Sequence, residues 1–126
     1  MGIINILIVD DESYQLIIAK TIIRGLYPDI KIDEAGTGMA AIKKMENKTY
    51  DLVLCDLMLP DITGEKILEF VRGHAKLKSI PFVIMTSSTD KQFIVNAARL
   101  GVTGYIIKPL TAEKLSAKLK KVLPDI

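Results

Sequence analysis

The sequence predicts an α/β fold in which helices cover both faces of one parallel β-sheet. Five short apolar runs alternate with five segments of helical period along the 126 residues. Several of these runs are almost continuous in Ile, Val and Leu, which is typical of strands buried on both faces. Strict alternation of strand and helix favours right-handed crossovers within a single sheet. We therefore expect a doubly wound, five-stranded parallel sheet.

The apolar runs define the expected strands. They are INILIV (4–9), IKIDEA (30–35), DLVLC (51–55), PFVIM (81–85) and GYIIK (104–108). The first, third and fourth runs carry almost no polar residue, so we place them at the centre of the sheet. The second run alternates apolar and polar residues, and this pattern suits a strand at the sheet edge.

The segments between the runs have the apolar period of amphipathic helices. The expected helices are 13–27, 37–48, 65–74, 91–100 and 111–123. Asp90 and Thr111 are expected N-caps, since their side chains can accept a hydrogen bond from the first turn. Gly101 is expected to stop the fourth helix, and Pro124 the fifth.

The first helix is apolar on more than one side. Its expected core stripe has i, i+3, i+4 spacing and consists of Tyr14, Ile17, Ile18, Thr21 and Ile22. Leu16, Ala19 and Ile23 lie beside that stripe, so the outer side of this helix is also expected to be apolar. Either a docking face or a wide contact with the core explains this composition.

Composition narrows the class of protein. Hydrophobic residues make up 49% of the chain and charged residues 25%, as in ordinary globular domains. The apolar stretches are far shorter than the ~18 residues of a membrane span. One cysteine excludes an internal disulfide, and one histidine and a net charge of +2 favour neither a histidine metal site nor nucleic-acid binding. We expect one cytoplasmic domain over 1–126, with no further output domain, no membrane insertion and no direct contact with nucleic acid.

Polar residues follow the apolar runs where each strand is expected to end. Asp10, Asp11 and Glu12 follow the first run, and Asp56 follows the third. The fourth run is followed by Thr86 with Ser87, and the fifth ends in Lys108 with Pro109. In open parallel sheets ligands bind beyond the carboxyl ends of the strands, so these side chains are expected to form one site.

The residue types at this edge are those needed for phosphoryl transfer. Two carboxylates about 4 Å apart repel by ~4 kcal/mol at an effective dielectric of 20, and a cation must offset that repulsion. Clustered carboxylate oxygens suit Mg²⁺, and Lys108 adds a second positive charge. Asp56 is a candidate nucleophile, while the hydroxyl of Thr86 can donate to a phosphoryl oxygen. The chain lacks the GxxxxGK[ST] pattern, which excludes a P-loop nucleotidase.

At these residues the sequence resembles the receiver domain of bacterial two-component response regulators, the CheY-like family. The matching segments are ILIVDDE, YDLVLCDLMLPDITG, VIMTSS and GYIIKPL, and together they extend the resemblance over essentially the whole chain. The resemblance implies a flavodoxin-like (βα)5 fold with strand order 2-1-3-4-5. Thr63 stands where the family mostly has Asp or Asn, and Leu110 stands where an aromatic residue is common.

The resemblance also implies a role for each strand-end residue. Asp56 would be the phosphoacceptor, and Asp10, Asp11, Asp56 and the backbone carbonyl of Met58 would hold Mg²⁺, with Mn²⁺ as a substitute. Lys108 would pair with the phosphoryl group, and Thr86 and Tyr105 would form the conformational switch. Glu12, Ser87 and Pro109 would support the site, Pro109 after a cis peptide bond. Glu12 is equally well explained as a favourable negative charge at the start of a helix.

The implied function is that of a signalling switch rather than an enzyme with a separate substrate, although such a domain catalyses its own phosphorylation and dephosphorylation. The expected phosphodonor is a histidine kinase or a histidine phosphotransfer protein, for which the first helix is a candidate docking face. The expected output face comprises helix 91–100, strand 104–108 and helix 111–123, and it would bind a downstream protein target. Its candidate contact residues are Lys91, Val95, Arg99, Tyr105, Lys114, Lys118 and Lys121.

We expect a monomer, with an activation-linked dimer as the alternative. The rival interpretation is a receiver-like scaffold that is never phosphorylated and acts only as a protein interaction module.

Overall fold

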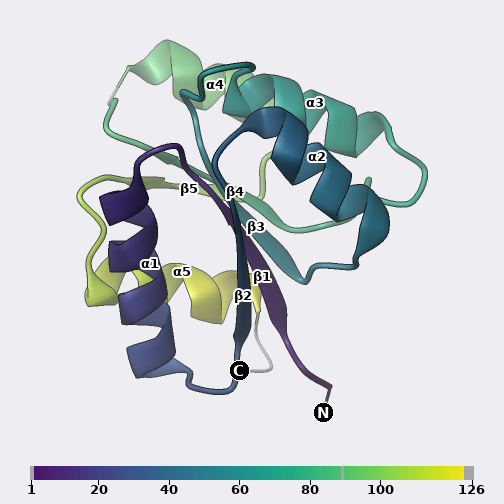
Figure 1. Cartoon of the computed structure of the whole chain (residues 1–126). Coiled ribbons are helices and arrows are strands. Elements are labelled where there is room, and N and C mark those ends of the chain that lie inside the picture. Colours follow the sequence, from purple (N-terminus) through teal and green to yellow (C-terminus); the bar gives the residue numbers. More distant parts are fainter. Residues whose placement is uncertain (1, 89, 124–126) are drawn as a thin grey trace.

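The computed structural model describes residues 2–88 and 90–123, and in them five strands alternate with five helices (Figure 1). In chain order the elements are β1 (Asn5–Val9), α1 (Ser13–Leu26), β2 (Lys31–Ala35), α2 (Gly38–Asn47), β3 (Leu52–Asp56), α3 (Gly64–Gly73), β4 (Phe82–Thr86), α4 (Lys91–Arg99), β5 (Gly104–Ile107) and α5 (Ala112–Val122). Each lies within one or two residues of the range expected from the sequence. Among the described residues, no helix is long and apolar enough to cross a lipid bilayer.

The five strands form one parallel sheet in the order β2-β1-β3-β4-β5. The expected strand order and the expected edge position of β2 are thus confirmed. In the register of the sheet, Val9 at the end of β1 lies opposite Cys55 of β3, and Asp56 lies opposite Met85 of β4. The carboxyl ends of the three central strands therefore meet at one edge.

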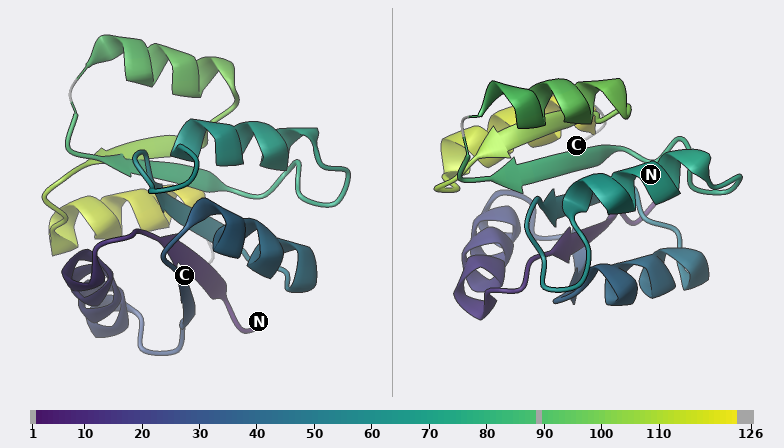
Figure 2. Two further views of the ribbon diagram at one scale, coloured as in Figure 1. Left: turned by 45° about the horizontal axis from the view of Figure 1, so that its top comes forward. Right: turned by 90° about the horizontal axis from the view of Figure 1, so that it is seen from above.

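Helices cover the sheet on both faces (Figures 1 and 2), with α1 and α5 on one face and α2, α3 and α4 on the other. Successive strand residues point to opposite faces, so Leu7 and Val9 pack in one core and Ile6 and Ile8 in the other. Every residue of β3 is buried. The central strands are therefore held from both sides, which gives their carboxyl ends fixed positions.

Side-chain caps set the starts of four helices. Thr37, Thr63, Asp90 and Thr111 each accept a hydrogen bond from a backbone N–H in the first turn of the helix that follows. The capping roles expected for Asp90 and Thr111 are confirmed. Gly101, just beyond α4, has a φ of 86°, in the left-handed region that favours glycine, and it ends that helix as expected. Pro124 lies outside the described residues.

The expected core stripe of α1 is wrong. Ala19 and Ile23 are fully buried against β1 and α5, whereas Tyr14 and Ile17 are 58% and 59% exposed. The remaining members of the expected stripe differ: Ile18 and Thr21 are exposed, and Ile22 is half-buried. Two apolar stripes with the same spacing run along this helix, so periodicity alone did not distinguish them. The small side chain of Ala19 allows the close approach of the helix to the sheet, and this packing selects the buried stripe.

The loop that joins β3 to α3 returns close to the end of β3. The N–H of Leu57 donates to the carbonyl of Met85 (3.1 Å), and the N–H of Gly64 donates to the carbonyl of Leu57 (2.8 Å). A Cβ atom at position 64 would lie 2.5 Å from the backbone oxygen of Asp56. Only glycine permits this approach of the α3 N-terminus to the carboxyl end of β3.

We predict that Gly64→Ala lowers the free energy of unfolding by about 1–3 kcal/mol, because backbone atoms of Asp56 and Leu57 must move to accommodate the methyl group. Gly73→Ala, at the other end of the same helix, is the matched control, since a Cβ there meets no atom within 4 Å. It should be neutral or stabilise by up to ~1 kcal/mol. Urea denaturation followed by circular dichroism measures both variants, and equal effects would contradict this account.

Candidate functional site

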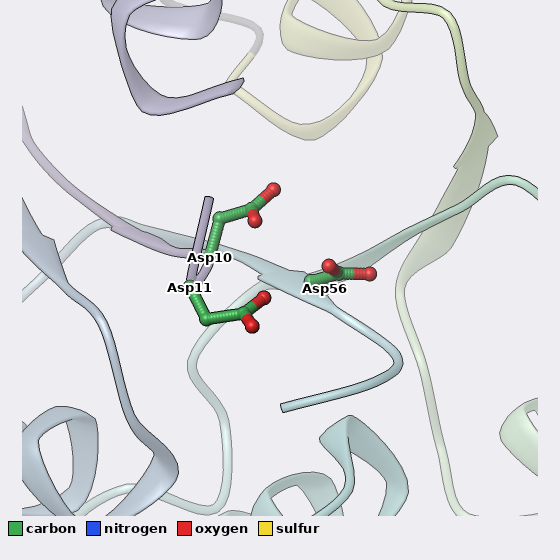
Figure 3. A group of neighbouring side chains, drawn as sticks. All are labelled: Asp10, Asp11 and Asp56. Carbon is green, nitrogen blue, oxygen red and sulfur yellow. The ribbon is translucent and has the colours of Figure 1, made fainter. Parts of the chain in front are cut away.

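Three carboxylates gather at the carboxyl edge of the sheet. Asp10 and Asp11 follow β1, Asp56 ends β3, and these two strands are neighbours in the sheet. One carboxylate oxygen from each residue lies within 4.8 Å of the others. Figure 3 shows Asp10 and Asp11 with their carboxylates on the side of Asp56. The parallel topology thus unites residues that are 46 positions apart in the chain, counting from Asp10 to Asp56.

Lys108 enters this group from the end of β5. Its Nζ lies 2.8 Å from Oδ2 of Asp10 and 3.4 Å from Oδ2 of Asp56. The other oxygen of Asp10 accepts a hydrogen bond from the N–H of Glu12 (3.0 Å). Asp10 is 1% exposed and Asp56 9%, while Asp11 is exposed. The structure therefore brings together four of the predicted site residues, namely Asp10, Asp11, Asp56 and Lys108.

The charged groups of the site alter one another's protonation. Burial raises the pKa of Asp56 above its ordinary value, and the charge of Asp10 raises it further, while the charge of Lys108 and the N–H of Met58 act in the opposite direction. For Lys108, burial alone would lower the pKa, but the hydrogen bond to Asp10 and the charges of Asp56 and Asp10 outweigh it and raise that pKa. An ionised Asp56 is therefore costly in this protein unless more positive charge is supplied.

The residues at this edge fit a divalent cation. Three carboxylates face one ammonium group, so the group carries an excess of two negative charges when all four are ionised. All the side-chain donors are oxygens, which are the ligands that Mg²⁺ prefers, and the exposure of Asp11 leaves one side of the group open to water. The donor set and the charge excess thus match the metal that the sequence predicts.

Thr86, Ser87 and Pro109 occupy the neighbouring strand ends. Thr86 ends β4, its side chain is buried, and its hydroxyl oxygen accepts a hydrogen bond from the N–H of Ser88 (3.0 Å). The carbonyl of Thr86 accepts a hydrogen bond from the N–H of Lys108 (2.7 Å), so the ends of β4 and β5 are joined. Ser87 is exposed. The peptide bond between Lys108 and Pro109 is cis, as the resemblance implied.

Three further predicted residues, Glu12, Met58 and Tyr105, have their side chains exposed to solvent. Glu12 precedes α1 and makes no side-chain cap hydrogen bond. Met58, two residues after Asp56, has an exposed side chain, and its backbone N–H acts on the carboxyl of Asp56. Tyr105 lies on β5 opposite Ile84, with its ring exposed and Nζ of Lys118 5.9 Å from the ring centroid.

One residue near the site was not identified from the sequence. Asp61, in the loop between β3 and α3, accepts hydrogen bonds from the N–H groups of Gly38 (2.8 Å) and Met39 (2.9 Å) at the start of α2. An Asp after Pro60 indicates a turn or a cap, but it does not indicate which helix is capped. Only the folded chain places this loop beside α2.

Comparisons with known proteins agree on one family. The sequence model of the response regulator receiver domain matches residues 6–120. The chemotaxis protein CheY of Pseudomonas aeruginosa is 34% identical over 122 residues, which cover 97% of this chain and 98% of that protein. CheY-3 of Vibrio cholerae is 36% identical over 118 residues, which cover 94% of this chain and 90% of that protein.

Solved structures show the same fold over nearly the whole chain. A two-component response regulator from Clostridium difficile has a TM-score of 0.87 and 32% identity, with 97% of both chains covered. A CheY-like receiver domain protein from Methanospirillum hungatei has a TM-score of 0.87 and 29% identity, with 98% of this chain and 96% of that chain covered. The match of the family model, the relatives above 30% identity and the acidic group at the sheet edge lead to one conclusion: this chain belongs to the response regulator receiver domain family, of the CheY type.

Proposed function

We propose that this protein is a phosphorylation-activated switch that accepts a phosphoryl group on Asp56 in a Mg²⁺-dependent reaction. The observation that supports this most strongly is the environment of Asp56. Its carboxylate is nearly buried, it lies within 4.8 Å of two other carboxylates, and only one ammonium group, that of Lys108, is paired with it among the described residues. A carboxylate in such surroundings is poised to act as a nucleophile once a cation and a phosphoryl group arrive.

The proposed reaction transfers a phosphoryl group from a phosphohistidine. A carboxylate oxygen of Asp56 forms a bond to phosphorus while the bond between phosphorus and the histidine nitrogen breaks, and the electron pair of that bond stays with the imidazole. A bound Mg²⁺, or Mn²⁺ in its place, would neutralise charge on the phosphoryl oxygens, held by Asp10, Asp11, Asp56 and the carbonyl of Met58. Lys108 already lies between two carboxylates and can donate to a phosphoryl oxygen. The same residues would serve hydrolysis of the product, so the domain would catalyse both its own phosphorylation and its dephosphorylation.

The proposed switch links Asp56 to the α4–β5–α5 face. A phosphoryl group adds roughly −1.5 to −2 of charge and strong acceptor oxygens, toward which the hydroxyl of Thr86 can turn. That hydroxyl now accepts from Ser88, and the exposed ring of Tyr105 can take the space that Thr86 leaves. A shift from 1:99 to 99:1 between two states requires ~5.5 kcal/mol of preference for the active one.

The α4–β5–α5 face is the proposed output surface for a downstream protein. Val95 and Tyr105 are exposed apolar side chains there, and Lys118 lies over the Tyr105 ring. Lys114 is less free, because its Nζ donates to the carbonyls of Ile107 (2.8 Å) and Pro109 (3.1 Å). The remaining cations on this face (Lys91, Arg99 and Lys121) favour an acidic partner segment. We propose that the protein acts in the cytoplasm as a monomer, with dimerisation through this face as the alternative.

A second surface, around the acidic group, suits the phosphodonor. Tyr14 and Ile17 of α1, Met39 of α2 and Met58 are all exposed large apolar side chains, between 58% and 62%, and each lies on an element at the carboxyl edge of the sheet. Of the three residues beside the expected stripe of α1, Ala19 and Ile23 are buried in the core and Leu16 is partly buried against it, which agrees with the wide core contact rather than with a docking face made by these residues. A protein that must bring its phosphohistidine to Asp56 would contact this apolar surface, and contacts of this kind dominate binding energy.

Phosphorylation by acetyl phosphate tests the proposed function directly. The wild-type protein should gain one phosphoryl group in Mg²⁺ and none in excess chelator, Asp56→Asn should gain none, and Lys108→Ala should react about tenfold more slowly or worse. Lys120→Ala, an exposed lysine on α5, is the matched control. Intact-protein mass spectrometry measures each. If the wild type gains no phosphoryl group from acetyl phosphate or from any phosphohistidine protein, the scaffold interpretation is correct.

We predict that Asp56→Asn stabilises the metal-free protein near neutral pH, by on the order of 1 kcal/mol. Because the pKa of Asp56 is raised in the folded state, its ionised form costs stability above that pKa. The advantage of the variant should therefore be full at neutral pH and disappear as the pH falls through the pKa of Asp56 toward its ordinary value of 3.8. Millimolar Mg²⁺ should stabilise the wild type more than the variant, because only the wild type has the third carboxylate.

Thermal melts with and without Mg²⁺ measure this difference. Asp29→Asn is the control, since Asp29 is exposed in the loop before β2, at the opposite edge of the sheet, and should change neither melt. A variant that is less stable than the wild type without Mg²⁺ would show that Asp56 is not under electrostatic strain.

We predict that Ile17→Glu slows phosphoryl transfer from a phosphorylated histidine phosphotransfer domain by about tenfold or more, because it places a charge in the apolar docking surface. Its reaction with acetyl phosphate should be unchanged, since that donor needs no docking surface. Val95→Glu makes the same change on α4, at the opposite surface, and should leave both reactions intact. Radiolabel transfer to each variant measures the rates, and equal slowing by both substitutions would place docking elsewhere.

A further inference from the structure

The loop between β3 and α3, residues 57–63, contacts the start of α2 in two ways: the carboxylate of Asp61 accepts hydrogen bonds from the first turn, and the side chain of Ile62 lies against Gly38. Asp61 accepts through Oδ1 from the N–H of Gly38 (2.8 Å) and through Oδ2 from the N–H of Met39 (2.9 Å), and Oδ1 also accepts from Ile62 (2.9 Å). Gly38 and Met39 begin α2, where N–H groups have no acceptor within the helix. Asp61 and Gly38 are 23 residues apart, so this link is a tertiary one.

The other hydrogen bonds of this loop lie at its base. Leu57 bonds to the carbonyl of Met85, and Gly64 bonds back to Leu57, so the two ends of the loop are held together. Thr63 caps its own helix. Within the part of the chain that the structure describes, Asp61 makes the only side-chain hydrogen bonds from this loop to another element. Met58, Leu59 and Pro60 therefore lie between the base of the loop and the segment that the hydrogen bonds of Asp61 and the packing of Ile62 hold against α2.

We propose that Asp61 is a positioning residue for the metal site: its bonds to α2 hold the loop that carries Met58 in the conformation in which the Met58 carbonyl would bind the metal. This inference rests on the proposed function, in which that carbonyl is a Mg²⁺ ligand. Asp61 itself does not belong to the acidic group of Asp10, Asp11 and Asp56. It acts through the backbone, because a loop with one conformation loses less entropy when a ligand binds than a loop with many.

Mg²⁺ titration of two cap variants of α2 tests the inference. Asp61→Ala removes two oxygens and Thr37→Ala one oxygen that accept from the first turn of α2, but of these two side chains only Asp61 links that turn to the loop. By calorimetry, Asp61→Ala should raise the Kd for Mg²⁺ by about tenfold, as outer-shell substitutions at metal sites do. Thr37→Ala should change it by less than about twofold. A similar rise in both variants, or in neither, would overturn the inference.

Two further readouts separate positioning from charge and from general damage. With acetyl phosphate, Asp61→Ala should require more Mg²⁺ for half-maximal phosphorylation but reach the wild-type rate at saturating Mg²⁺. The difference in Kd should also persist at high ionic strength, where the effect of an exposed charge beyond a Debye length is screened. A difference that vanishes in high salt would assign the effect to charge and contradict the inference. If the wild type itself binds no Mg²⁺, the proposed function fails together with the inference. If the wild type binds Mg²⁺ but the two variants have the same Kd, only the inference fails.

Discussion

The repulsion among three carboxylates at one edge of the sheet is the constraint on which the rest of this structure depends. Asp10 and Asp56 are nearly withdrawn from water, and among the described residues Lys108 alone supplies positive charge between them. At short range in a protein, each pair of like charges costs several kcal/mol. The fold must therefore hold these groups together against their own electrostatics, and it leaves an excess of negative charge that a divalent cation can neutralise.

The scaffold resists this repulsion through its central strands. β1, β3 and β4 are packed on both faces, so the chain cannot relieve the repulsion by moving a strand end. The close approach of Gly64 to the backbone of Asp56 adds a further restraint just behind the carboxylate. Cys55, next to Asp56, is fully buried, and burial together with the charges of Asp56 and Asp10 raises the pKa of its thiol, so it contributes packing rather than reactivity.

The helices around this edge differ in how many residues they bury and in surface character. In α4 only Ala97 is buried, whereas α3, a helix of similar length, buries four residues. The surface beside the acidic group, with Tyr14, Ile17 and Met39, is apolar, whereas the α4–β5–α5 face combines apolar and basic side chains. Under the proposed function, these two surfaces of different chemistry would allow one partner to deliver the phosphoryl group and another to respond to it.

The strand order came from the resemblance to the receiver family, whereas the residues alone predicted the strands, the parallel sheet and the side chains that meet at its carboxyl edge. Those predictions rest on local patterns: continuous apolar runs define central strands, and parallel topology places Asp10, Asp56 and Lys108 together whatever the details of packing. The stripe of α1 that is buried and the helix that Asp61 caps could be identified only in the folded chain. Both depend on contacts between segments far apart in the chain: Ala19 packs on the sheet and α5, and Asp61 finds the open N–H groups of α2. Periodicity and residue type show which faces of a segment can be buried and which groups it can bond. The neighbouring segments determine which of these contacts form.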